Sequence, residues 1–167
     1  MATRDAAVLQ TFFRGCDRIE GNLGLTLDKQ GCDNRAYYPN GGFWNIDRKM
    51  REKGCSKYWK NGIPELAPEI WSVVPETNSP GKVGWTLDPN KITHWVVCTF
   101  DPSDTRMCYC LSFPDYRSFF TKEKDNLISS GHYRVATQTS GGWRSQCVFI
   151  PITVFKENDI QMFEVSI

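Results

Sequence analysis

The sequence has few of the features that mark a membrane-spanning or secreted protein. No stretch approaches the roughly eighteen consecutive apolar residues that a transmembrane helix needs. Residues 1–5 lack the charged-then-apolar layout of a signal peptide. We therefore expect a cytoplasmic protein with no membrane partner.

Several common kinds of functional site are missing as well. The chain has seven cysteines and two histidines, with no C-x-x-C pair and no histidine at zinc-finger spacing. Cys108 and Cys110 lie two apart in an apolar run, so we expect them on one face of a strand as buried thiols. A Gly-rich phosphate loop, a G-x-S-x-G elbow and an H-E-x-x-H pair are absent. These absences leave His94 and His132 as isolated residues, which we expect to be structural.

The net charge of +1 over 167 residues hides an uneven distribution of charge. Residues 44–62 carry six basic and two acidic residues, a local net charge of +4. Such a run is typical of a surface that tracks phosphates, although a solvated loop or helix face is the alternative. The sequence therefore predicts DNA contacts from the run's cations apart from Lys49: Arg48, Arg51, Lys53, Lys57 and Lys60.

The pattern of apolar residues predicts an α+β fold, a central mixed β-sheet flanked by helices. We expect one domain over 1–167, with an irregular insert at about 63–92 that holds a short helix ending near Val74. The other expected helices cover 5–14 and 114–127. The expected strands cover 22–27, 32–38, 43–50, 93–100, 107–113, 133–136 and 146–150.

The most informative segment is the expected hairpin of 32–38 and 43–50. In an antiparallel pair, the numbers of facing residues have a constant sum. A turn centred on Asn40 makes this sum 80 and sets Asp33 opposite Asp47, whereas a two-residue Asn40-Gly41 turn makes it 81 and sets Asp33 opposite Arg48. Facing Cβ atoms are about 4.5–5.5 Å apart, so two carboxylates there would repel unless a cation lay between them. Mg²⁺ takes one or two carboxylates together with water and substrate phosphate, and it fits this requirement.

Lys49 lies two residues beyond Asp47 and projects from the same face of the strand, while Arg48 points to the opposite face. An ammonium beside a metal-held water can orient that water or stabilise charge on a phosphoryl transition state. Asp47-x-Lys49 taken alone is typical of a solvent-facing charge pair. The preceding acid at hairpin spacing and the basic run that follows favour a nuclease site.

These residues resemble the PD-(D/E)xK nuclease superfamily, which includes restriction endonucleases. The resemblance rests on Asp33 and Asp47-x-Lys49 in a hairpin after an N-terminal helix, and on the lead-in D-x-Q-G-x-D at 28–33. It covers roughly residues 3 to 150, with the specific part at 28–49. The family's proline before the first acid is replaced by Cys32.

The resemblance implies a restriction-endonuclease-like core in which Asp33 and Asp47 are metal ligands and Lys49 is the catalytic lysine. An acid from the first helix region often joins the ligands, and Asp5 and Glu20 are both candidates. Asp28 and Gln30 are expected to support the ligands or touch substrate, or to cap the turn that presents Asp33.

The expected activity is Mg²⁺-dependent hydrolysis of DNA phosphodiester bonds, with Mn²⁺ as a substitute. The setting, whether phage, mobile element or restriction, stays open, and a double-strand cut would need a homodimer or two visits. One alternative is a catalytically inactive module on the same fold that binds DNA or protein, and another is an interaction protein whose hairpin charges are incidental. Arg144, in a Gly-rich turn, is a further candidate DNA contact, with a plain hairpin loop as its alternative.

Overall fold

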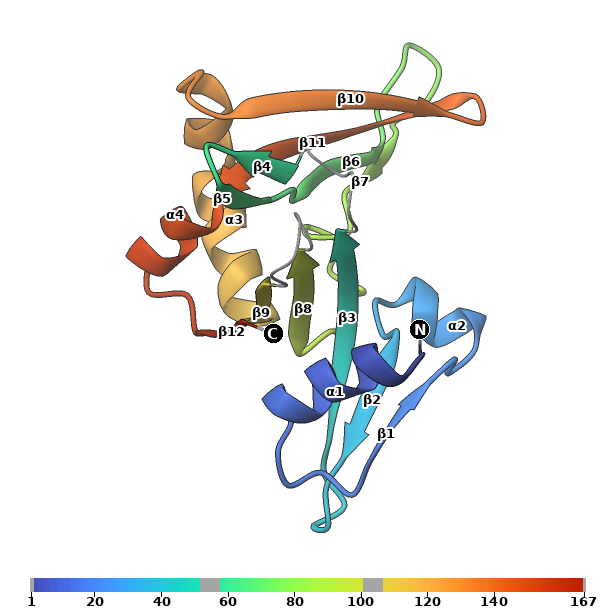
Figure 1. Ribbon diagram of the computed structural model, residues 1–167. Helices are drawn as coiled ribbons and strands as arrows, with labels where there is room; N and C mark the ends of the chain where they lie inside the picture. The colour runs from blue at the N-terminus through green and yellow to red at the C-terminus, as the bar shows by residue number, and fades with distance from the viewer. Residues whose placement is uncertain (1, 52–57, 101–106, 167) are drawn as a thin grey trace. The chain divides into compact units, whose positions relative to one another are not determined.

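The computed structural model describes residues 2–51, 58–100 and 107–166, with the side chains of 2–5 and 51 left out (Figure 1). The chain forms two compact units. The first contains residues 1–55, 90–114 and 161–167, and the second contains 56–89 and 115–160. The expectation of a single domain over 1–167 stays a prediction.

The first unit is built on a six-stranded sheet whose order is β1-β2-β3-β8-β9-β12. β3 and β8 are parallel, and the other neighbours are antiparallel, so the sheet is mixed as expected. Its strands are β1 (Arg18–Gly21), β2 (Asn34–Tyr37), β3 (Phe43–Arg51), β8 (Trp95–Phe100), β9 (Met107–Ser112) and β12 (Met162–Ser166). The helices α1 (Ala2–Phe12) and α2 (Leu25–Lys29) belong to the same unit.

Helix α1 lies across β2 and β3 and covers one face of this sheet (Figure 1). Its apolar stripe contributes Val8 and Leu9 to a buried cluster with Ile46 of β3. Cys108 and Cys110 join the same cluster, which confirms that both point to one face. Because side chains alternate along a strand, Ile46 on the α1 face places Asp47 and Lys49 on the opposite face.

The second unit carries a sheet of its own, with the order β4-β5-β11-β6-β7 and β10 paired to β11. Its strands are β4 (Trp59–Lys60), β5 (Ile63–Leu66), β6 (Glu69–Val73), β7 (Lys82–Val83), β10 (Arg134–Ser140) and β11 (Trp143–Pro151). α3 (Phe113–Ser129) runs into this unit, and α4 (Ile152–Glu157) follows β11. Phe155 of α4 packs against Tyr116 and Phe119 of α3, with ring centroids 5.4 and 5.6 Å apart.

The α+β class, the 34–51 hairpin, the strands near 93–113 and the helix after Pro114 are confirmed, but two local expectations are wrong. The helix expected before Val74 and the irregular insert are replaced by β5, β6 and β7. β11 offers β5 and β6 a partner for their backbone hydrogen bonds, and β6 in turn pairs with β7. The strand expected at 22–27 is wrong, because this segment follows β1 as irregular chain at 22–24 and then begins α2. Gly24 has φ +96°, which breaks an extended chain, and Asp28 N–H then donates to Gly24 O to close a helical turn.

Candidate functional site

The β2–β3 hairpin has the register in which facing residues sum to 80. Asn34 pairs with Ile46 and Tyr37 pairs with Phe43. Asn40 lies at the tip, where its Oδ1 accepts the Gly42 N–H at 2.9 Å. The alternative register, which would have set Asp33 opposite Arg48, is therefore wrong, and Asp33 extends β2 toward Asp47.

Asp33 is held at the point where the regular ladder stops. Its backbone N–H donates to Ile46 O at 2.9 Å, and its carboxylate Oδ2 accepts the Arg48 backbone N–H at 2.7 Å. The side chain thus takes over a hydrogen bond that a strand residue would otherwise make with its main chain. This contact fixes the carboxylate against β3.

Asp47 is buried, with 3% of its surface exposed, and it is paired with Lys49. Lys49 Nζ donates to Asp47 Oδ1 at 3.0 Å and lies 2.8 Å from Oδ2. The approach to Oδ2 is an ion pair without hydrogen-bond geometry, so this buried oxygen accepts no hydrogen bond from the part of the chain that the structure describes. The Lys49 ammonium compensates the charge of this oxygen, and a hydrogen-bond donor or a metal ion would supply the bond that it lacks.

The negative charge of Asp47 acts on the neighbouring Asp33 carboxylate. Burial raises the pKa of Asp33 above its ordinary value, the Arg48 N–H opposes this shift, and the nearby negative charge of Asp47 raises the pKa further. A buried acid whose ionisation is disfavoured by a neighbouring carboxylate lies at a site that a cation would stabilise.

The donors present fit Mg²⁺ bound through two carboxylates, with water and phosphate completing its shell. The pair Asp33 and Asp47 supplies these oxygens, and the Asp47 Oδ2 described above is one that a cation would satisfy. Among residues 2–51, 58–100 and 107–166, no group of three or more His, Cys, Asp or Glu side chains is placed to hold a metal. These residues therefore do not form a metal site in which protein side chains supply every ligand.

Among the residues whose side chains the structure describes, no third acid joins this pair to form a metal-holding group. Glu20 lies on β1, where Arg18 Nε approaches its Oε1 to 2.7 Å, and this hydrogen bond lowers the pKa of Glu20. The side chain of Asp5 lies outside the described residues. The fourth ligand expected from the first helix region stays a prediction.

The segment that carries Asp33 is fastened to the residues that precede β8. Thr93 Oγ1 donates to Gly31 O at 2.6 Å, and Ile92 N–H donates to Gln30 O at 3.0 Å. Gly31 has φ +79°, and a Cβ there would lie 2.5 Å from Thr93 Oγ1. Gln30 also ends α2, where its backbone N–H lies 3.0 Å from Leu27 O, and these backbone bonds support the loop that presents Asp33.

Asn45, which sequence reasoning missed, braces the same region. Its Oδ1 accepts Arg35 Nε at 2.8 Å, its Nδ2 donates to Ile92 O at 3.0 Å, and its backbone N–H donates to His94 Nδ1 at 2.9 Å. His94 thus has a structural contact, as expected. Positions 45, 47 and 49 share one face by strand alternation, and this period was the signal that could have identified Asn45.

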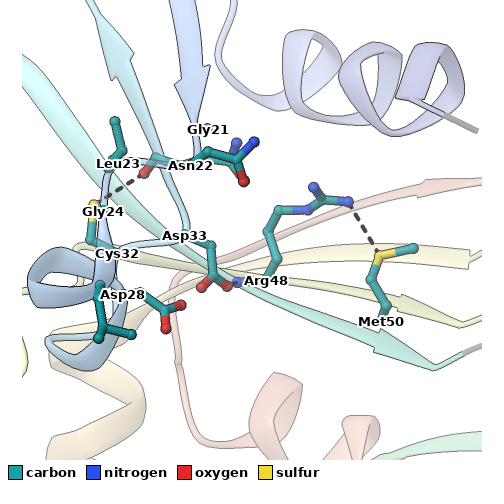
Figure 2. Close-up of a pocket in the computed structure, with 11 residues that line it drawn as sticks. Gly21, Asn22, Leu23, Gly24, Asp28, Cys32, Asp33, Arg48 and Met50 are labelled. Atoms are coloured by element: carbon teal, nitrogen blue, oxygen red, sulfur yellow. Dashed lines mark hydrogen bonds between the residues drawn. The ribbon is translucent and has the colours of Figure 1, made fainter.

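A cavity of about 690 Å³ opens beside Asp33 (Figure 2). Asp28, placed near the ligands by sequence reasoning, lines this cavity and so does Arg48. The rest of the wall is formed by the β1–α2 turn and by the start and end of the hairpin: Gly21, Asn22, Leu23, Gly24, Leu25, Cys32, Asn34 and Met50.

The predicted DNA contacts fall in different parts of the molecule. Arg48 is in the first unit, whereas Lys60 and Arg144 are in the second. Arg144 Nη2 lies 3.5 Å from Glu76 Oε1. The side chains of Arg51, Lys53 and Lys57 lie outside the described residues, so a continuous basic surface stays a prediction.

Comparison with known proteins adds no relative: no family model, no curated protein and no solved structure matches this chain. Within the described part of the chain, none of the helices has the length and apolar character needed to cross a membrane.

Proposed function

We propose that this protein is a metal-dependent DNA endonuclease with a restriction-endonuclease-like core. The observation that carries the proposal is the buried Asp47 carboxylate, which is paired with Lys49 and lies close enough to Asp33 to raise its pKa. An isolated solvent-facing charge pair would be exposed, whereas Asp47 is 3% exposed.

Asp33 and Asp47 would hold Mg²⁺, which supplies Lewis acidity and an activated water when bound. The Arg48 backbone N–H keeps Asp33 in place for this role. Lys49, anchored by Asp47, holds an ammonium beside the two acids, where it orients a water and stabilises negative charge that develops on a phosphoryl oxygen.

The order of elements in the first unit supports the same proposal. A helix precedes the hairpin that carries the acid–acid–lysine set, and β8 and β9 continue the mixed sheet beyond β3. The substrate is DNA, with contacts proposed from Arg48 and the basic run. A nick is compatible with a monomer, and a double-strand break would need a homodimer or two visits.

The direct test is cleavage of supercoiled plasmid with Mg²⁺ or Mn²⁺, in which nicked and linear products separate on one gel. We expect Asp47→Ala and Lys49→Ala to abolish cleavage while circular dichroism shows a folded protein. Asp125→Ala and Lys124→Ala are matched controls, because Lys124 Nζ lies 2.7 Å from Asp125 Oδ1 in an ion pair on α3. Cleavage at the wild-type rate by Asp47→Ala would refute the assignment.

The second candidate is an inactive DNA- or protein-binding module on the same fold. It is favoured by the fact that the described residues supply two acids and no third to a metal. DNA binding without cleavage, together with no rise in melting temperature when Mg²⁺ or Mn²⁺ is added, would support this candidate over the nuclease.

A further inference from the structure

The cavity beside Asp33 has the size of a ligand pocket and a mixed chemical lining. Its volume of about 690 Å³ falls within the range of about 300–1,000 Å³ that small-molecule sites occupy. The Asp33 carboxylate belongs both to this wall and to the acid pair. Any group bound in the cavity would therefore lie next to the proposed metal position.

The wall offers hydrogen-bond donors, acceptors and apolar surface together. Arg48 contributes a guanidinium, and its Nη2 approaches Met50 Sδ to 3.5 Å. Asp28 contributes a carboxylate from α2. In Figure 2 the Asp33 carboxylate lies between that of Asp28 and the Arg48 side chain. Leu23 and Met50 add apolar atoms to the same wall.

This combination suits a flat ring with both donors and acceptors on its edge. Two carboxylates would repel a phosphate group on its own, and Arg48 would repel a lone metal ion. Guanine presents two acceptors, O6 and N7, which an arginine fork can bind, and N–H donors on its other edge, which a carboxylate can accept. Adenine has an amino donor where guanine has O6, so Arg48 would bind it less well.

We propose that the cavity binds a guanine base of DNA, swung out of the helix beside the bond that is cut, with Arg48 and Asp28 reading its two edges. The proposal rests on the nuclease function given above. A base inside a duplex is stacked and paired, so the cavity walls can surround one only after it has left the stack. An unpaired guanine, which has less stacking to lose, should then bind best.

The test measures binding in EDTA, where no cleavage occurs, by fluorescence anisotropy of labelled DNA. Duplexes with one unpaired guanine, adenine, cytosine or thymine are compared with the fully paired duplex. We expect unpaired guanine to bind about tenfold more tightly than unpaired adenine, the discrimination of one good bidentate contact. Arg48→Met should reduce this ratio to near one, and Asp28→Asn, which keeps an acceptor oxygen and leaves Arg48 in place, should reduce it by a smaller factor. Arg18→Met, which changes an exposed arginine outside the cavity, should keep the ratio.

Equal binding of the four unpaired bases would overturn the proposal. The protein could also bind guanosine monophosphate more tightly than adenosine monophosphate and show no preference among the DNA duplexes. This result would assign the cavity to a free nucleotide and overturn the proposal that it binds a base of DNA. The nuclease proposal is tested by a separate measurement, and it fails if neither Mg²⁺ nor Mn²⁺ supports plasmid cleavage. Plasmid cleavage without base preference would leave the nuclease standing and remove this inference alone.

Discussion

Replacing Gly31 with alanine tests whether the contact between the Asp33 loop and Thr93 sets the geometry of the site. Gly31 has φ +79°, and an alanine Cβ would lie 2.5 Å from Thr93 Oγ1, closer than real Cβ contacts. The same hydroxyl donates to Gly31 O at 2.6 Å, so relieving the clash would disturb this hydrogen bond. The loop two residues before Asp33 must then move.

The expected loss of unfolding free energy has two parts, one from the backbone conformation and one from the contact with Thr93, and a control variant can separate them. A non-glycine residue in the left-handed region costs about 1–2 kcal/mol. Loss of the hydrogen bond from Thr93 adds about 0.5–1.5 kcal/mol, and the steric clash adds to this. Gly41→Ala is the matched control, because Gly41 has φ +82° at the turn of the β2–β3 hairpin and a Cβ there would meet nothing within 4 Å. It should show the first cost alone.

The assays are urea unfolding and plasmid cleavage, each measured on both variants. We expect Gly41→Ala to lose about 1–2 kcal/mol of unfolding free energy and to retain cleavage. We expect Gly31→Ala to lose about 2–4 kcal/mol and to cleave at least about tenfold more slowly, since small displacements of a catalytic group are costly. Equal losses of stability in the two variants, or full activity of Gly31→Ala, would refute the reasoning.

Two further predictions concern buried polar side chains. Asn45→Ala removes the hydrogen bonds to Arg35 and Ile92 O, and we expect it to lower the unfolding free energy by about 2–4 kcal/mol, measured by urea unfolding. An unchanged unfolding curve would contradict this prediction. Glu65→Gln should raise the melting temperature at pH 7, because burial raises the pKa of Glu65 despite Arg134 at 3.7 Å, and the folded state therefore disfavours its charged form. An acid whose pKa is raised by folding contributes stability at pH values below its unfolded pKa, near 4.5, and loses that contribution as the pH rises through its pKa in the folded state. The gain in melting temperature from Glu65→Gln should therefore shrink toward zero in acid. A gain that is independent of pH would contradict this cause.

Local patterns predicted the hairpin because its signals agree with one another. Asn40 and Gly41 favour a turn, and the arms alternate with a period of two, so the register could be narrowed to two alternatives, with sums of 80 and 81, before the structure was known. By contrast, Leu23, Leu25 and Leu27 also alternate, yet this segment is not a strand. Leu25 is 67% exposed, which shows that the period of two did not mark a buried face there.

The prolines near 64–75 misled the prediction in a different way. Pro64 and Pro68 suit the first turn of a helix, and a helix needs no partner from elsewhere in the chain. In the fold, Leu66 pairs with Ile150, more than eighty residues away in sequence. Pairing with a distant segment therefore stabilises a strand even where the local sequence favours a helix. β12 was missed for the same reason, since its partner is β9.

The sequence by itself determined that Asp33 lies within one residue of facing Asp47 and that Lys49 shares the face of Asp47, because strand alternation and turn position are local properties. The structure decided between the two registers. The tertiary structure alone decided that Asp47 is buried, that the Arg48 N–H holds Asp33, and that Asn45 and Thr93 brace the loop. It also placed a cavity against Asp33. These features depend on which distant segments fold against the hairpin, and burial and hydrogen-bond partners come from those segments.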